Sequence, residues 1–95
     1  MTQVASMTCY RSAAYVSWAV EATGVLVLDE VDGRALELTY PQAAIWDFLV
    51  QGRPLGRVIE LTALVAGCSA EAAHHLVAEA VTEWLADGWL AVREA

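Results

Sequence analysis

The sequence predicts an α+β fold in which a three-stranded antiparallel sheet is followed by three helices. Two observations support this class. After an irregular start, the first part of the chain contains short runs of alternating and β-branched residues separated by glycine-containing turns. From Pro41 onward, the apolar residues instead recur at the three- and four-residue spacing of helices that bury one side. Strands therefore come first along the chain and helices second.

The three strands are predicted at residues 15–20, 25–28 and 34–38. Aromatic and β-branched residues fill the first two, and a segment ending in Gly24 separates them. Asp32-Gly33 supplies the positive φ that a tight reversal into the third strand needs. The result is a meander of three antiparallel strands, and the thirteen residues before it are expected to form a mobile or irregular arm.

The third strand has a clear alternation. Leu36 and Leu38 lie on one face of it, and Ala35 and Glu37 lie on the other. The first helix follows with almost no loop, so this strand is expected to lead directly into the helical layer.

Three helices are predicted at about residues 41–51, 55–66 and 70–87. Thr39 is expected to cap the first helix and Ser69 the third, and Pro41 falls in a first turn, where a missing N–H costs nothing. A glycine follows each of the three segments, at Gly52, Gly67 and Gly88. A short apolar tail, residues 89–92, comes after the last one. On the second helix, the buried side is expected to consist of Leu55, Val58, Ile59, Thr62 and Val65.

The third helix has a wider apolar surface than one contact with a core usually requires. At about 100° per residue, the centre of its apolar stripe consists of Ala73, Val77, Ala80 and Trp84. One flank is polar and includes Glu79, Glu83 and Asp87. The other flank, which extends the apolar surface, consists of His74, Ala78, Val81 and Leu85. Two interpretations stay open: a helix wedged between the sheet and the other helices, or a flank that lines a groove.

Composition limits the classes of function. The net charge is -7, and all five basic residues are arginines that are scattered along the chain. Nucleic acids and anionic membranes are bound by clustered positive charge, so neither is an expected partner. Cys9 and Cys68 form no C-x-x-C pair, and the N-terminus lacks the basic start and apolar run of a signal peptide. We therefore expect a protein of one domain, residues 14–95, in the reducing cytoplasm.

No catalytic or metal-binding constellation is predicted. His74 and His75 are adjacent, so on a helix they point about 100° apart and do not converge on one metal ion. The sequence has no glycine-rich phosphate loop and no Ser, His and acid arrangement in a recognisable context. We expect no enzyme activity and no cofactor. Trp46 lies off the apolar stripe of the first helix and is the tryptophan expected to contact a partner.

The chain resembles the PqqD-like family, the peptide-recognition domains that serve enzymes modifying ribosomally made peptides. The resemblance covers about residues 15–92 and depends on three segments: 36–46, where the strand enters the helix as Leu-Glu-Leu-Thr-Tyr-Pro-Gln-Ala-Ala-Ile-Trp; 52–59, with Gly before Pro-Leu-Gly-Arg-Val-Ile; and 81–90, Val-Thr-Glu-Trp-Leu-Ala-Asp-Gly-Trp-Leu. These are patterns of packing and capping. Gln51-Gly52 stands where the family commonly has Asp-Gly.

The resemblance implies a winged helix-turn-helix relative that binds the leader segment of a precursor peptide as an extra strand beside its third strand, against its third helix. Edge strands offer unpaired backbone groups, and pockets beside them select side chains. On this sequence the backbone ladder would run from Arg34 to Thr39, through Ala35, Leu36, Glu37 and Leu38, with charge preferences set by Arg34 and Glu37 at its ends. From the helical count, His74, Ala78, Val81 and Leu85 would form the pocket wall. The partners would be a leader peptide and a radical-type or cyclase/protease-type modifying enzyme in natural product biosynthesis.

The alternative is a winged-helix interaction domain. A DNA-binding version ranks low, because the second and third helices offer only Arg57 against several glutamates. A domain for subunit assembly is harder to separate, since an open strand edge also pairs with a second copy as a homodimer or with an enzyme.

Overall fold

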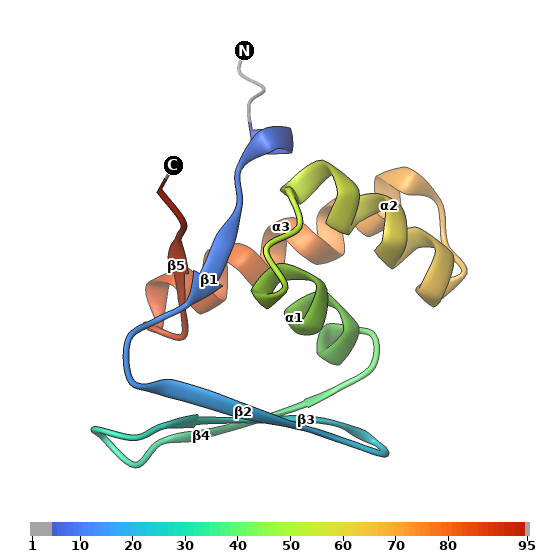
Figure 1. The fold of residues 1–95 in the computed structure, drawn as a ribbon. Helices are drawn as coiled ribbons and strands as arrows, with labels where there is room; N and C mark the ends of the chain where they lie inside the picture. Colours follow the sequence, from blue (N-terminus) through green and yellow to red (C-terminus); the bar gives the residue numbers. More distant parts are fainter. Residues whose placement is uncertain (1–4, 95) are drawn as a thin grey trace.

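In the computed structural model, which describes residues 5–94, the chain forms two small antiparallel sheets and three α-helices (Figure 1). In chain order the elements are η1 (Ala5–Met7, a 3-10 helix), β1 (Tyr10–Ser12), β2 (Val16–Glu21), β3 (Gly24–Asp29), β4 (Ala35–Thr39), α1 (Gln42–Val50), α2 (Leu55–Ala66), α3 (Ala70–Ala86) and β5 (Leu90–Val92). The α+β class predicted from the sequence is confirmed, as is the three-stranded meander that precedes the helices.

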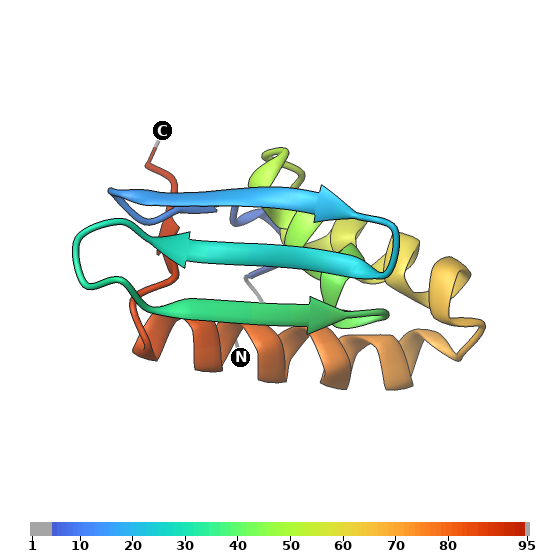
Figure 2. The same ribbon diagram turned by 90° about the horizontal axis from the view of Figure 1, so that it is seen from below.

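The larger sheet has the strand order β2-β3-β4, so β3 is central and both β2 and β4 are edge strands. The helices cover one face of this sheet, and the other face is open (Figure 1). Viewed from that open face, α3 runs along the outside of β4 for most of the length of the strand (Figure 2). α3 therefore lies beside the outer edge of β4, with which no strand pairs among residues 5–94.

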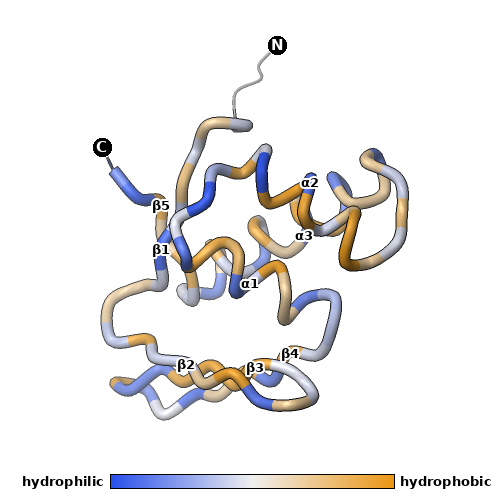
Figure 3. The backbone as a smooth tube through the Cα atoms, turned by 45° about the vertical axis from the view of Figure 1, so that its right-hand side comes forward, coloured by the Kyte–Doolittle hydropathy of each residue, from blue (hydrophilic) through white to orange (hydrophobic). Residues whose placement is uncertain are grey.

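The core lies between the sheet and the helices. Figure 3 shows hydrophobic segments recurring along the strands and along α1 and α2. Trp46 is fully buried at its centre, with edge-to-face contacts to Trp18 at 6.0 Å and to Trp84 at 5.4 Å between ring centroids. The expectation that Trp46 contacts a partner is therefore wrong, because its ring is enclosed by two other tryptophans.

The two ends of the described chain form a second sheet that the sequence did not reveal. Strand β1 pairs with β5, with Tyr10 opposite Val92, and Tyr10 is buried. The main chain around it is also tied to the helices, since Leu55 N donates to the Thr8 carbonyl at 2.8 Å. Of the arm expected over residues 1–13, residues 1–4 lie outside the described residues. Residues 10–12 belong to the fold rather than to an irregular arm.

The helix ends mostly follow their capping signals. Ser69 accepts a hydrogen bond from Ala72 N at the start of α3, as predicted, and Gly67 adopts the left-handed conformation at the end of α2. Thr39 is not the cap of α1: it is the last residue of β4, and Pro41 occupies the N-cap without a side-chain hydrogen bond. The predicted inner face of α2 is correct except for Val65, which is exposed at the end of the helix.

Candidate functional site

The outer edge of β4 carries unpaired backbone groups. Asp29 N donates to the Arg34 carbonyl at 2.9 Å, and in an antiparallel pair such bonded positions alternate along the strand. With the β3–β4 register, Leu36 and Leu38 are then bonded to β3. The N–H and C=O groups of Ala35, Glu37 and Thr39 point away from β3. Among residues 5–94 no strand pairs with this edge, so β4 presents a free ladder of three residues.

A cleft of ≈ 150 Å³ lies between this edge and α3. Its lining residues come from β4, from the first residue of α1, from α3 and from the segment just after α3: Leu36, Leu38, Gln42, Leu76, Glu79, Ala80, Glu83, Trp84, Asp87 and Trp89. The strand residues in this set are the two leucines whose side chains point toward the helical layer. A side chain that entered the cleft would therefore lie between the inner face of β4 and one flank of α3.

The cleft has an apolar floor and an acidic rim. Leu38, Ala80 and Trp84 are buried at its base, and Leu76 is half-buried on the wall formed by α3. Three carboxylates, those of Glu79, Glu83 and Asp87, follow the same wall toward solvent. An apolar side chain would find cover in this cleft, whereas an acidic one would meet like charge.

Arg34 holds one end of the cleft together. Its Nη2 forms an ion pair with Asp29 Oδ2 at 2.9 Å, and its Nη1 donates to the Asp87 carbonyl at 3.0 Å at the end of α3. The guanidinium also lies over the ring of Trp89, 4.5 Å from the centroid. Arg34 therefore joins the β3–β4 turn to the C-terminal end of α3, so its position is set by contacts within the fold.

The Asp29 carboxylate is held in its charged form at this junction. The hydrogen bond from Arg34 lowers the pKa of Asp29 below its usual value, and the backbone N–H groups of Asp32 and Val31 act in the same direction. The two N–H groups both bond to Asp29 Oδ1, which fixes the turn before β4. The start of the free edge is thereby anchored by one aspartate and one arginine.

The residues predicted for the site divide into two groups in the structure. The strand residues from Arg34 to Thr39 lie at the open edge, as the sequence predicted, and the alternation of Leu36 and Leu38 inward with Ala35 and Glu37 outward is confirmed. The α3 flank is different. None of His74, Ala78, Val81 and Leu85 lines the cleft. The expectation that this flank faces the third strand is wrong, because α3 is rotated so that its opposite flank does.

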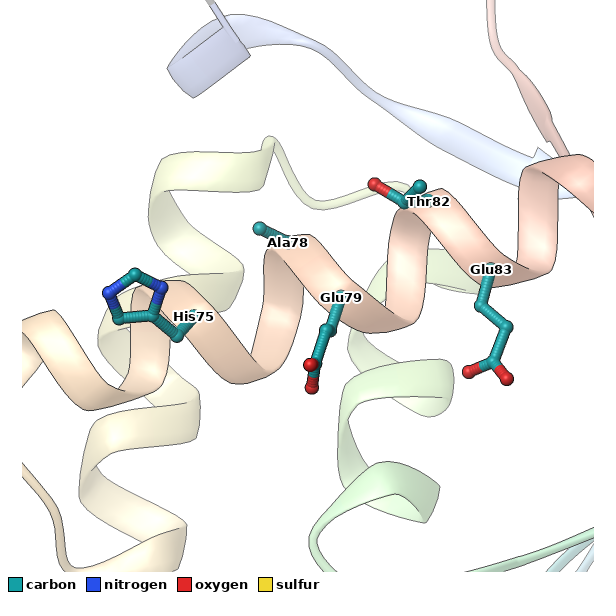
Figure 4. Close-up of a pocket in the computed structure, with 5 residues that line it drawn as sticks. All are labelled: His75, Ala78, Glu79, Thr82 and Glu83. Carbon is teal, nitrogen blue, oxygen red and sulfur yellow. The ribbon is translucent and has the colours of Figure 1, made fainter.

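The four flank residues have separate surroundings. Val81 is 6% exposed and belongs to the hydrophobic core, whereas His74, Ala78 and Leu85 are exposed. Ala78 lines a shallow surface hollow together with His75, Glu79, Thr82 and Glu83 (Figure 4). All five of these residues come from α3, and Ala78 and Thr82 point to the opposite side from the two glutamates. Among the described residues, its whole lining comes from one helix, so this hollow gives a peptide no second wall.

Sequence reasoning missed Leu76 and the part played by the acidic flank. Leu76 is four residues before Ala80, so both lie on one side of α3, next to Glu79, Glu83 and Asp87. The sequence did contain a signal for this: Leu76 is a leucine that lies among carboxylates on the flank of α3 that was predicted to be polar.

The described residues contain neither a metal-binding cluster nor a helix that could span a membrane. Within residues 5–94 no three His, Cys, Asp or Glu side chains are grouped so that they could hold a metal ion. In the same part of the chain, no helix is both long and apolar enough to cross a membrane.

Comparison with solved structures identifies the fold as one seen in small proteins that were solved with leader peptides bound. One of these is described as lasso peptide synthetase B1 complexed with the leader peptide; it is 23% identical, with a TM-score of 0.74 over 85% of this chain and 95% of that one. The other is TbiB1 in complex with the TbiA(β) leader peptide, 14% identical, with a TM-score of 0.77 over 84% and 93% of the two chains. No family model and no curated protein matches the sequence. The fold implied by the resemblance in the sequence is thereby confirmed.

Proposed function

We propose that this chain is a non-catalytic peptide-binding module that captures the leader segment of a ribosomally made precursor peptide by β-strand addition and presents it to a modifying enzyme. One observation carries the proposal. The unpaired edge of β4 lies next to a cleft whose far wall is α3. Edge and cleft together offer what an extended peptide needs, a backbone ladder and a place for alternate side chains.

The ladder would supply affinity without regard to sequence. An incoming strand would bond to the outward N–H and C=O groups of Ala35, Glu37 and Thr39 and would continue the sheet beyond β4. The backbone bonds of Arg34, Leu36 and Leu38 to β3 would be unaffected, because the N–H and C=O groups of these residues point toward β3 and away from the peptide. A leader segment of about five residues is enough to cover this ladder, since β4 itself has five residues.

The cleft would supply selectivity. Neighbouring residues on adjacent strands place their side chains on the same face of a sheet. Peptide residues opposite Leu36 and Leu38 would therefore project into the cleft, toward Leu76 and Ala80 on α3. Their neighbours along the peptide would project to the open face of the sheet. The module would thus read every second residue of its ligand.

Two solved structures of this fold support the proposal because each is a complex with a leader peptide. A bound leader would hold the rest of the precursor close to the enzyme and would raise its local concentration there. The enzyme would be of the radical or the cyclase/protease type, and the setting would be the cytoplasm.

The rival is a domain for subunit assembly, in which the open edge of β4 pairs with a second copy or with another protein. Long unpaired edges favour such pairing. Gel filtration with and without peptide separates the two functions. A monomer that gains only the mass of the peptide supports leader capture, whereas a dimer that peptide does not dissociate supports assembly.

The direct test is amide hydrogen exchange in the presence of a leader peptide, taken from a short precursor encoded beside the gene for this chain or selected from a displayed library of random peptides. Binding should slow exchange at Ala35, Glu37 and Thr39, whose N–H groups are free, by about tenfold or more. Leu36 and Leu38, already bonded to β3, serve as internal controls and should change little. Protection at all five positions alike, or at none, would contradict addition of a strand at this edge.

A further inference from the structure

The α3 wall of the cleft carries a row of uncompensated negative charge. Glu79, Glu83 and Asp87 succeed one another at four-residue intervals and all line the cleft. Within residues 5–94 the ion pairs formed by side chains are those of Arg34 and Arg57, and none includes any of these three carboxylates. Arg34 lies at the Asp87 end of the row, where it donates to the Asp87 carbonyl, but its ion pairs are with Asp29 and Asp32. The row therefore faces the open cleft without a partner.

The spacing of this row matches an extended peptide. Four residues of an α-helix advance about 6 Å along its axis. Two residues of a β-strand advance about 6.6 Å. Because α3 runs along the β4 edge (Figure 2), each carboxylate of the row would lie near one cleft-facing side chain of a bound strand. Each step along the peptide thus meets a carboxylate on the opposing wall.

Between the strand and this row lies the apolar floor of the cleft. Leu76 and Ala80 on α3 and Leu36 on β4 would cover the aliphatic stem of a long side chain, while its end reached the carboxylates. Lysine and arginine have this structure, an apolar stem with a cationic head. Glu37 adds a fourth carboxylate on the open face of β4, also without an ion pair among the described residues.

We infer that the leader recognised by this chain is a basic one: it has apolar and Lys or Arg side chains at alternating positions on the strand face that enters the cleft. This inference rests on the proposed function, because it concerns the peptide that the β4 edge would capture. Acidic leaders are rejected by the same row, since like charges would face each other across the cleft. The basic residues fix which peptide is bound, and the backbone ladder holds it.

The test selects a displayed library of random peptides in parallel on the wild-type protein and on the triple variant Glu79→Gln/Glu83→Gln/Asp87→Asn. A matched control, Asp47→Asn/Glu60→Gln/Glu71→Gln, removes the same charge from helix positions that do not line the cleft. Selected peptides are then synthesised and titrated by fluorescence anisotropy at low and high salt. Circular dichroism verifies that each variant is folded.

Wild-type protein should enrich peptides with Lys or Arg at every second or fourth position. The triple variant should enrich the same apolar alternation without basic residues, and it should bind the basic peptides roughly tenfold more weakly at low salt, a difference that shrinks as salt rises. The control variant should bind them within about twofold of the wild type.

Two kinds of result would overturn the inference. They differ in whether the proposed function survives. Apolar alternation without basic enrichment on the wild type, or an equal loss in the control variant, would refute the role of the acidic row and leave the proposed function intact. If the selected peptides bind equally well to Glu37→Pro, which lacks the central one of the three outward N–H groups of β4, then strand addition itself fails and the proposed function fails with it.

Discussion

The two edges of the larger sheet present similar backbones and different surroundings. In β2, Glu30 N donates to the Tyr15 carbonyl, and with the β2–β3 register the backbone groups of Trp18 and Val20 then point outward. In β4, the outward groups are those of Ala35, Glu37 and Thr39. As far as the described chain shows, no strand pairs with either edge.

What differs is the element beside each edge. Along β4 runs α3, with the cleft between them (Figure 2). Beside β2 the inward side chains instead pack onto α1, with Trp18 against Trp46. Val20, which is 63% exposed, lines an apolar hollow of ≈ 220 Å³ with Phe48 and Val65. No helix follows the β2 edge within residues 5–94 (Figure 2).

The comparison shows that an unpaired edge is not by itself a binding site. Both edges can form backbone hydrogen bonds with a peptide, but within residues 5–94 a helix runs alongside β4 and not alongside β2, which has a single apolar hollow at Val20. A peptide on β2 would gain the ladder and one apolar hollow, without a helix along the strand to select its alternate side chains. We therefore expect captured peptides at β4 only.

The largest expected effect comes from proline in the two edges. Glu37→Pro removes an N–H that faces away from β3, so it should spare the sheet and weaken peptide binding at least 100-fold, by loss of a ladder bond and by a clash of the ring with the incoming strand. Val20→Pro makes the same change in β2 and should leave affinity unchanged. Titration of both variants by calorimetry provides the measurement, with circular dichroism as the check on folding. Equal losses in the two variants would remove the distinction between the edges.

A second pair of variants compares the two flanks of α3. Leu76→Asp places a charge on the cleft wall and should weaken peptide binding by about 30-fold, which corresponds to roughly 2 kcal/mol of lost apolar contact and desolvation. Leu85→Asp, on the flank that the sequence had favoured, is the matched control and should bind as the wild type does.

Affinity is again measured by titration. The milder variant Leu76→Ala should show a smaller loss of affinity, and it serves as the control in case Leu76→Asp damages the fold. A stronger effect from Leu85→Asp than from Leu76→Asp would reverse the assignment of the wall.

The smallest effect concerns the ion pair of Asp29 and Arg34, which anchors the start of the β4 edge. The Asp29 carboxylate in this pair is held in its charged form. Because the pKa of Asp29 is lowered in the folded protein, its ion pair stabilises the fold above the unfolded pKa of about 4, and this contribution is lost as pH falls through the lower folded pKa. Asp29→Asn should therefore be less stable than the wild type at neutral pH, and the gap should narrow below about pH 4. Urea unfolding across this range measures it. A gap that stays constant with pH would show that Asp29 acts through its hydrogen bonds and not through its charge.

Much of the fold was readable because its signals are local. The bounds of α2 agree with the sequence prediction, and Ser69 caps α3 as expected. The alternation in β4 also identified which leucines face inward. The pairing of β1 with β5 was not readable, because each strand has three residues and their partners lie at opposite ends of the chain. So short a run has no period, and its pairing depends on a contact between distant parts of the chain.

One half of the candidate site, the strand, could be predicted because its signals are local, and the other half, the wall formed by α3, could not. The open strand follows from strand order, whereas the wall depends on the rotation of α3 about its axis. Both flanks of the apolar stripe carry a leucine, Leu76 on one and Leu85 on the other, so helical periodicity left the choice between them undecided. In the structure, the flank of α3 that carries Leu76 faces β4, and Val81, which belongs to the opposite flank, is buried in the core.

The sequence by itself determined the order of the elements, the inward face of β4 and the charge that any partner must meet, since each of these follows from residues close together along the chain. Only the tertiary structure decided that α3 lies beside the free edge with its acidic flank forward. Packing against α2 and α1 sets that rotation, and such contacts between distant segments leave no periodic trace in the chain.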